Sequence, residues 1–249
     1  MKLKKPTSWA LTICMLGGLL GGLAHAQDNE QAARMTTALT SAARPAEDKE
    51  RDAARKPIQT VQFLGIKTGD TVIDAIAAGG WFTEVLSAAV GPNGKVLAQN
   101  PQFFVSQQGF VEREKARHDR LKNVQAVHGE LAAAGIVAQA DAAVTALNLH
   151  DLYGQQNGEA GAVAFAKSIY DALKPGGVFG VIDHVGVEGQ NNAQFHRIQI
   201  AQARDVLTKA GFRIEAESDI LRNPGDDHTK PVFEMQRRTD QFLIRARKP

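Results

Sequence analysis

The chain has 249 residues, of which 43% are hydrophobic, and this is enough for one domain with a sizeable core. Its 29 basic and 27 acidic residues nearly balance, so no surplus of positive charge favours nucleic acid as a partner. The single cysteine, Cys14, excludes a framework of disulfides within the chain, and stability therefore has to come from the hydrophobic core.

Residues 1–26 have the composition of a secretory signal peptide. Three lysines lie within the first five residues, residues 11–23 are apolar and rich in glycine, and Ala24-His25-Ala26 offers small residues to a signal peptidase. A membrane anchor is the alternative, but the apolar run is shorter than the roughly 20 residues that span a bilayer. We expect cleavage after Ala26 and a periplasmic or secreted protein. The mature chain would have 26 basic and 27 acidic residues, so neither nucleic acid nor a membrane surface is an expected partner.

Residues 27–57 form a polar, alanine-rich N-terminal extension. Pro45 can open a helix, and charges of both signs follow at residues 47–52, which is typical of a solvated helix face. We therefore expect a helical extension that precedes the main domain.

The main domain is organised around residues 67–100. An apolar run at 71–76 predicts a buried strand, and the run breaks at Gly79-Gly80. Apolar residues then recur at helical spacing as far as Val90, and a second strand is expected at 95–98. This strand–helix–strand unit has the layout in which the turn after the first strand binds a ligand.

Strands and helices alternate over the rest of the chain. Further strands are expected at 124–127, 142–149, 178–182, 212–217 and 241–245, and further helices at 58–64, 103–121, 131–134, 162–173 and 192–210. The pattern predicts a doubly wound α/β domain over residues 58–249. Its sheet should have seven strands and be mostly parallel, with the last two strands antiparallel at an edge.

Two segments carry a resemblance to a known family. VIDAIAAGGWFTEVL, which begins at Val72, resembles the first motif of class I S-adenosylmethionine (SAM) dependent methyltransferases, and LKPGGVF at residues 173–179 resembles the turn into their fifth strand. More closely, nearly all of the mature chain resembles a bacterial group of exported methyltransferase-like proteins. Arg44-Pro45 and residues 52–57 match patterns that recur in that group, which makes a lid over the sheet edge the alternative to a solvated helix.

The resemblance implies a SAM site at the carboxyl ends of the first two strands. Its residues would be Asp74, Ala78, Gly79, Gly80, Gln99 and Asn100. Two features depart from the family pattern. Ile76 and Ala78 stand where the family has glycine, and the second strand ends in Gln99-Asn100 where the family has an acid that binds the ribose hydroxyls.

Histidines and aspartates end the next two strands. His150 and Asp151 follow the fourth strand, His184 follows the fifth, and His196 is expected on the helix beyond it. We interpret His150, Asp151 and His184 as candidate catalytic residues that act as a general base on a hydroxyl or amine, with Asp151 or Asp183 orienting a ring. A packing role is the alternative for each histidine. The histidines could also hold a divalent metal together with Asp151, but no tight spacing supports one, so no metal is predicted.

Two functions of different classes are consistent with these features. The first is an exported SAM-dependent methyltransferase that acts on a small molecule. The second is a ligand-binding or scaffold protein that keeps the fold without the cofactor. A nucleotide-dependent oxidoreductase is disfavoured because the first loop lacks the G-x-G-x-x-G pattern.

Overall fold

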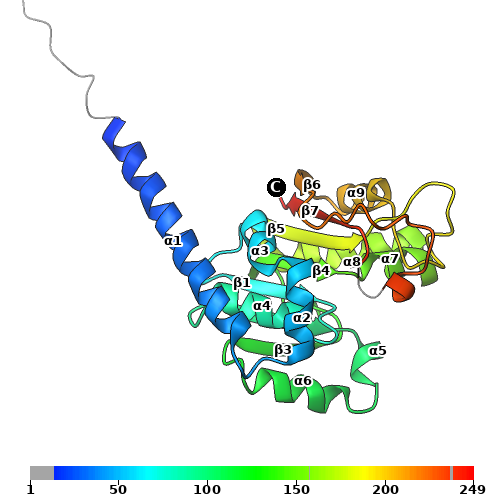
Figure 1. Cartoon of the computed structure of the whole chain (residues 1–249), viewed down its shortest axis with the longest axis horizontal. Coiled ribbons are helices and arrows are strands. Elements are labelled where there is room, and N and C mark those ends of the chain that lie inside the picture. The colour runs from blue at the N-terminus through cyan, green and yellow to red at the C-terminus, as the bar shows by residue number, and fades with distance from the viewer. Residues whose placement is uncertain (1–13, 157, 236–237) are drawn as a thin grey trace, which may run out of the picture.

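The computed structural model of the chain describes residues 14–156, 158–235 and 238–249 (Figure 1). The first half of the predicted signal peptide, residues 1–13, lies outside the described residues. The helix α1 (Cys14–Thr40) passes through the expected cleavage point after Ala26, and its first turns project away from the domain. Cleavage stays a prediction. No helix within the described ranges combines the length and the apolar stretch that crossing a membrane requires.

The centre of the molecule is one seven-stranded sheet with the order β3-β2-β1-β4-β5-β7-β6. The first five strands are parallel, and the last two are antiparallel to their neighbours at one edge, which confirms the predicted fold class. The strands are β1 (Thr71–Ala75), β2 (Lys95–Asn100), β3 (Val124–His128), β4 (Ala140–Ala146), β5 (Leu173–His184), β6 (Arg213–Ser218) and β7 (Gln241–Arg247).

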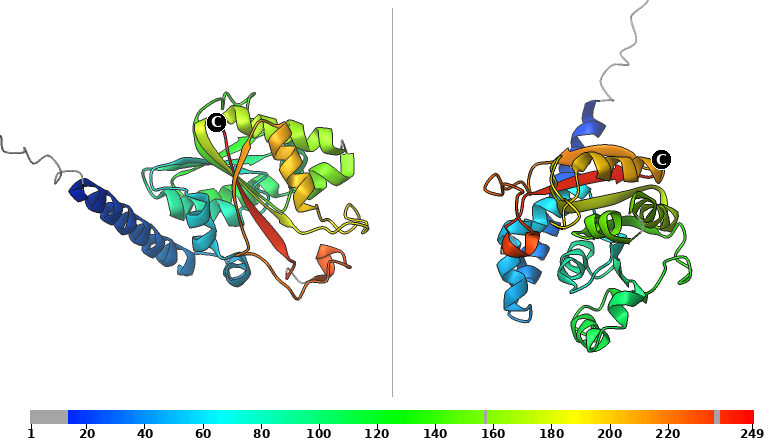
Figure 2. Two further views of the ribbon diagram at one scale, coloured as in Figure 1. Left: turned by 90° about the horizontal axis from the view of Figure 1, so that it is seen from above. Right: turned by 90° about the vertical axis from the view of Figure 1, so that its right-hand side faces the viewer.

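Helices cover both faces of the sheet (Figures 1 and 2). One apolar core joins α1, α3 (Pro57–Leu64) and α4 (Trp81–Val90) to one face. The other core joins α8 (Gly158–Ala172) and α9 (Ile200–Lys209) to the opposite face. The central strands are therefore buried on both sides, which is why they appear in the sequence as continuous apolar runs. The remaining helices are α2 (Ala46–Arg55), α5 (Gln102–Val105), α6 (Phe110–His118), the short α7 (Leu149–Asp151), a π-helical turn (Leu152–Gln156) and a 3-10 turn (Val232–Met235).

The N-terminal extension packs one face on the domain, so the expectation of a solvated helix is wrong for that face and holds for the other, where Glu50 and Ala54 are exposed. Arg44 and Asp48 are buried, with exposed fractions of 4% and 2%. Asp48 accepts a hydrogen bond from Arg117 of α6 at 2.7 Å, and its backbone carbonyl accepts one from the Trp81 indole at 3.0 Å. Arg44 pairs with Asp52 and lies 3.2 Å from the Glu84 carboxylate. Buried charges have to be paired, so these contacts fix α2 over the start of α4.

Five local predictions are wrong in kind or in extent. The strand expected at 178–182 runs from Leu173 to His184. The helix expected at 103–121 is two helices, because Gly109 adopts a left-handed conformation (φ 70°) between them. Residues 131–134 form turns. The strand expected at 142–149 ends at Ala146, since Leu147 turns into the left-handed region (φ 64°). The helix expected from residue 192 begins only at Ile200.

Candidate functional site

The loop between β1 and α4 holds three residues in the left-handed region. The φ angles are 58° at Ile76, 47° at Ala78 and 75° at Gly80, which caps the start of α4. Only the last of these is a glycine. A side chain in this region costs roughly 1–2 kcal/mol per residue, and a β-branched residue is seldom found there. The loop therefore keeps the backbone shape of a glycine-rich turn although two of its positions are not glycine.

The end of β2 holds this loop in place. The amide groups of Ile76 and Ala78 donate to the side-chain oxygens of Gln99 and Asn100, at 3.1 and 2.7 Å. The Ala77 amide donates to the Gln99 carbonyl at 2.9 Å. The two amide side chains that replace the family's acid thus satisfy loop N–H groups, a use that the sequence prediction did not foresee. Gln99 and Asn100 in turn donate to the Gly129 carbonyl and to the Glu114 carboxylate.

Two cavities flank the end of β2. The first, of about 310 Å³, is lined by Ala78, Gly79, Gly80 and Asn100 together with residues of α6, and Glu47 of α2 reaches its wall. The second, of about 290 Å³, is lined by Ile76 and Gln99 and by residues that follow β3 and β4. Five predicted cofactor-site residues therefore line cavities at the carboxyl end of the sheet, where open α/β sheets bind ligands.

Asp74, the sixth of them, lies under the loop. It is 2% exposed, and its carboxylate accepts a hydrogen bond of 2.6 Å from the Thr83 hydroxyl. Burial raises the pKa of Asp74 to about 6, against the opposing effect of the Thr83 hydrogen bond. Asp74 is therefore a carboxylate whose negative charge is poorly compensated by the protein.

The helical turn after β4 carries His150 and Asp151. Asp183 of β5 accepts a hydrogen bond from the His150 backbone amide at 2.9 Å and contacts the ring Nδ1 at 2.6 Å. Asp183 is thus the carboxylate that orients this ring, one of the two for which the sequence predicts the role. Burial opposes a charge on His150, but the neighbouring Asp183 and Asp151 carboxylates outweigh it and raise its pKa to about 10.

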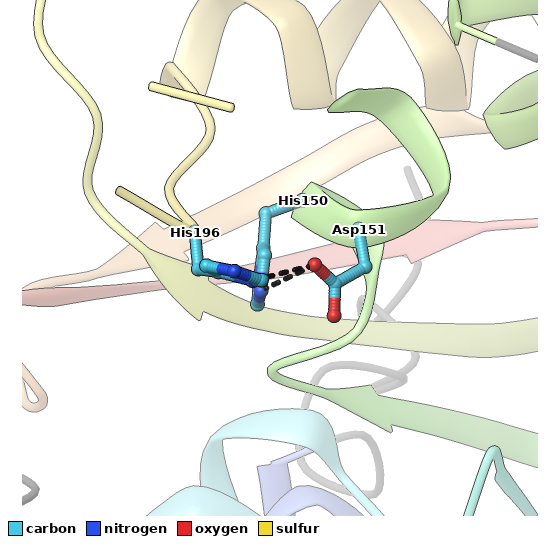
Figure 3. Close-up of side chains that lie close together, drawn as sticks. All are labelled: His150, Asp151 and His196. Carbon is cyan, nitrogen blue, oxygen red and sulfur yellow. Dashed lines mark hydrogen bonds and ion pairs between the residues drawn. The ribbon is translucent and has the colours of Figure 1, made fainter. Parts of the chain in front are cut away.

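Figure 3 shows that His196 and Asp151 lie beside the His150 ring. Asp151 Oδ1 is 2.8 Å from His196 Nδ1 and 3.3 Å from His150 Nε2. His196 comes from the loop before α9 and not from the helix that the sequence predicts, and its φ angle is 54°. Sequence reasoning placed His196 on a helix beyond the fifth strand and missed its contact with Asp151.

The structure also brings His184 beside His150, Asp151 and His196, and these four residues are called the histidine cluster below. Its ring centroid lies 5.4 Å from that of His150, and its Nδ1 is 2.7 Å from the Thr239 hydroxyl. Burial, and then the positive charges of His150 and Arg197, lower the pKa of His184 to about 4 against the pull of Asp183. At neutral pH one ring of the pair is charged and the other is neutral.

The histidine cluster and the ligand loop belong to one edge of the sheet. Asn148, two residues before His150, donates to the carbonyls of Ile76 and Ala146 at 3.3 and 2.9 Å. The side chain of Asn148 thereby links the β1 loop to the end of β4. Because β4 pairs with both β1 and β5, residues from three neighbouring strands converge here.

The fold is that of class I SAM-dependent methyltransferases. A SAM-dependent methyltransferase from Aquifex aeolicus is similar, with a TM-score of 0.57 and 20% identity over 83% of this chain and 99% of that one. One from Mesorhizobium loti has a TM-score of 0.51 and 17% identity over 80% and 97% of the chains. The [4+2]-cyclase SpnF has a TM-score of 0.56 and 18% identity over 79% and 82%. No protein-family model and no curated protein matches the sequence.

Proposed function

We propose that the protein is an exported SAM-dependent methyltransferase that acts on a small-molecule acceptor. The observation that carries this proposal is the left-handed backbone at Ile76 and Ala78. Strain of this kind persists where the surrounding structure imposes it, and it is concentrated at ligand sites. The loop keeps the shape that lets the backbone approach a ligand, at the edge of the sheet where this fold binds ligands. Adjoining cavities of about 290–310 Å³ suit a small molecule.

The histidine cluster supplies groups for the methyl acceptor. In the reaction a lone pair of an acceptor oxygen or nitrogen forms a bond to the methyl carbon, the bond to the SAM sulfur breaks, and the acceptor loses a proton. The half-exposed Asp151 is placed to receive that proton, and His150, which Asp183 orients and which carries its proton at neutral pH, is placed to donate a hydrogen bond to the acceptor. The His184 ring packs beside the His150 ring, with 5.4 Å between their centroids.

Calorimetric titration of the full chain with SAM, and with its demethylated product, tests the cofactor. A matched pair of variants at Gly79 tests the cavity, because a Cβ there meets nothing within 4 Å and its φ needs no glycine. We expect Gly79→Ala to bind nearly as the original chain does, and Gly79→Leu to bind at least tenfold more weakly with an unchanged melting temperature. Absence of binding by the original chain would exclude the methyltransferase proposal.

A cofactor-free binding protein is the second candidate, and one observation favours it. The N–H groups of Ile76, Ala77 and Ala78 already have partners at the end of β2. A loop whose donors are satisfied internally can be stable without a ligand. This candidate predicts no heat with SAM, together with a loop that protects its amide hydrogens from exchange in the free protein.

Export is supported by where packing begins in α1. Ala26 and Gln27 are exposed, and Gln31 is the first buried residue among those whose burial is described. Gln31 donates to the carbonyls of Ile66 and Ala89, so the domain holds the helix just beyond the proposed cleavage point. N-terminal sequencing of the natural protein should find Gln27 first in a periplasmic or secreted fraction. Met1 on a cytoplasmic protein would contradict export.

A further inference from the structure

We infer that His150, Asp151 and His196 form a binding site for a divalent transition-metal ion of the zinc type. Each residue offers one ligand atom, and the three atoms lie within 4.8 Å of one another (Figure 3). This inference goes beyond the proposed function, because a metal site at this cluster does not depend on SAM.

The distances fit tetrahedral coordination. Bonds of about 2.0–2.1 Å to nitrogen and oxygen set the ligand atoms about 3.3 Å apart in a tetrahedral site. His150 Nε2 and Asp151 Oδ1 are separated by 3.3 Å, and His196 Nδ1 is 2.8 Å from the same oxygen. The ligand atoms of His150 and His196 lie within 4.8 Å of each other, so small movements of the two rings bring all three pairs to tetrahedral spacing. Three protein ligands leave a further position for water or for an oxygen of a substrate.

The surroundings of His150 match those of a metal ligand. A histidine that binds a metal through one nitrogen almost always places its other nitrogen against a carboxylate or a carbonyl. In His150 the Asp183 carboxylate lies 2.6 Å from Nδ1 and so occupies that second nitrogen, while Nε2 faces Asp151 and is the nitrogen that would bind the ion. Asp183 is itself held by the backbone amides of His150 and His184 at 2.9 and 2.7 Å. The ring is therefore positioned before any ion arrives.

Two contacts fix the position of His196, one through the next residue and one against its ring. The next residue, Arg197, is fully buried and pairs with Asp226 through two hydrogen bonds of 2.8 and 3.0 Å. Phe233 lies edge-on against the His196 ring, with 4.6 Å between ring centroids, although 75% of Phe233 is exposed. The loop thus fixes a histidine with a left-handed backbone beside Asp151.

The ligand set selects the class of ion. Two imidazoles and one carboxylate suit Zn²⁺, or Fe²⁺ in the same arrangement, whereas Mg²⁺ and Ca²⁺ prefer oxygen ligands. Asp151 has 47% of its side chain exposed and His196 has 23%, so an ion can reach the site from solvent.

The test titrates the full chain, purified without a polyhistidine tag and stripped with a chelator, with Zn²⁺ alone. We expect one equivalent to bind in the micromolar range or tighter, Co²⁺ to give the visible absorption of a low-coordinate site, and Mg²⁺ not to compete. Asp151→Asn and His196→Ala should each weaken Zn²⁺ binding at least tenfold. Both residues are partly exposed, and circular dichroism checks that the variants fold.

The control is His128→Ala. His128 also lies beside a carboxylate, that of Glu114 at 2.6 Å, but it is outside the cluster, and its loss should leave Zn²⁺ affinity unchanged. Equal losses in the control and the two ligand variants, or no loss in either ligand variant, would overturn the site. So would the absence of stoichiometric binding. Because no SAM is present, these results are independent of the cofactor titration.

Discussion

The buried carboxylate of Asp74 should make the stability of the protein depend on pH in a predictable way. Its pKa is raised from 3.8 to about 6, chiefly by burial. A group with a raised pKa in the folded state contributes stability that is complete below its unfolded pKa and is lost as the pH rises through the folded value. The folded protein should therefore lose stability at this site between about pH 4 and about pH 7.

The size of the effect follows from the shift. One pKa unit corresponds to about 1.4 kcal/mol, so a rise from 3.8 to about 6 amounts to about 3 kcal/mol. Asp74→Asn removes the titrating group and keeps an oxygen that can accept from the Thr83 hydroxyl. The free energy of unfolding of the variant should therefore not fall at this site as the pH rises. Relative to the original chain, the variant should gain most of this amount, about 2 kcal/mol, between about pH 4 and about pH 7.

Urea unfolding followed by circular dichroism at a series of pH values measures this difference. The matched control is Asp219→Asn, since 93% of the Asp219 side chain is exposed and its removal should shift stability equally at all these pH values. A constant difference between Asp74→Asn and the original chain across the range would refute the reasoning. A difference that shrinks as the pH rises would refute it as well.

Three further outcomes are expected. Ala78→Gly should raise the free energy of unfolding by up to about 1 kcal/mol, because it relieves a left-handed alanine, whereas Ala77→Gly should lower it. Thermal unfolding measures both changes, and equal effects would show that the strain is absent. Arg197→Met should lower the free energy of unfolding by about 3–5 kcal/mol, because it leaves the Asp226 carboxylate buried without its partner. Arg197→Met combined with Asp226→Leu should lower it clearly less, and a double-mutant cycle by urea unfolding measures the difference. Arg117→Gln should lower the free energy of unfolding, measured in urea, by about 2–3 kcal/mol, because it leaves the buried carboxylates of Asp48 and Glu84 short of a donor. A loss below 0.5 kcal/mol would lie in the ~0.2–1 kcal/mol range of an exposed pair and would show that these ion pairs do not hold α2.

The sequence alone determined the architecture of the sheet. A central parallel strand is buried on both faces, so β1 and β2 appear as apolar runs that need no knowledge of their neighbours. The end of α3 at Gly65 and the start of α4 at Gly80 follow from local backbone requirements. Crossover rules gather the carboxyl ends of the parallel strands at one edge. The strand order that makes the fourth and fifth strands neighbours came from the family resemblance and not from spacing, and the structure places the His150 and His184 rings 5.4 Å apart.

Only the tertiary structure decided which side chains meet at that edge. The contact of His196 with Asp151 joins residues 45 positions apart, and no local spacing encodes it. Helical periodicity around residue 196 was overridden by long-range partners, above all the Asp226 carboxylate that buries Arg197. In the sequence, Gln99 and Asn100 showed only that the family's acid is absent. The tertiary structure shows that their side-chain oxygens accept hydrogen bonds from the loop amides. Periodicity reports which face of an element is buried, but the partner of a buried polar group depends on the whole fold.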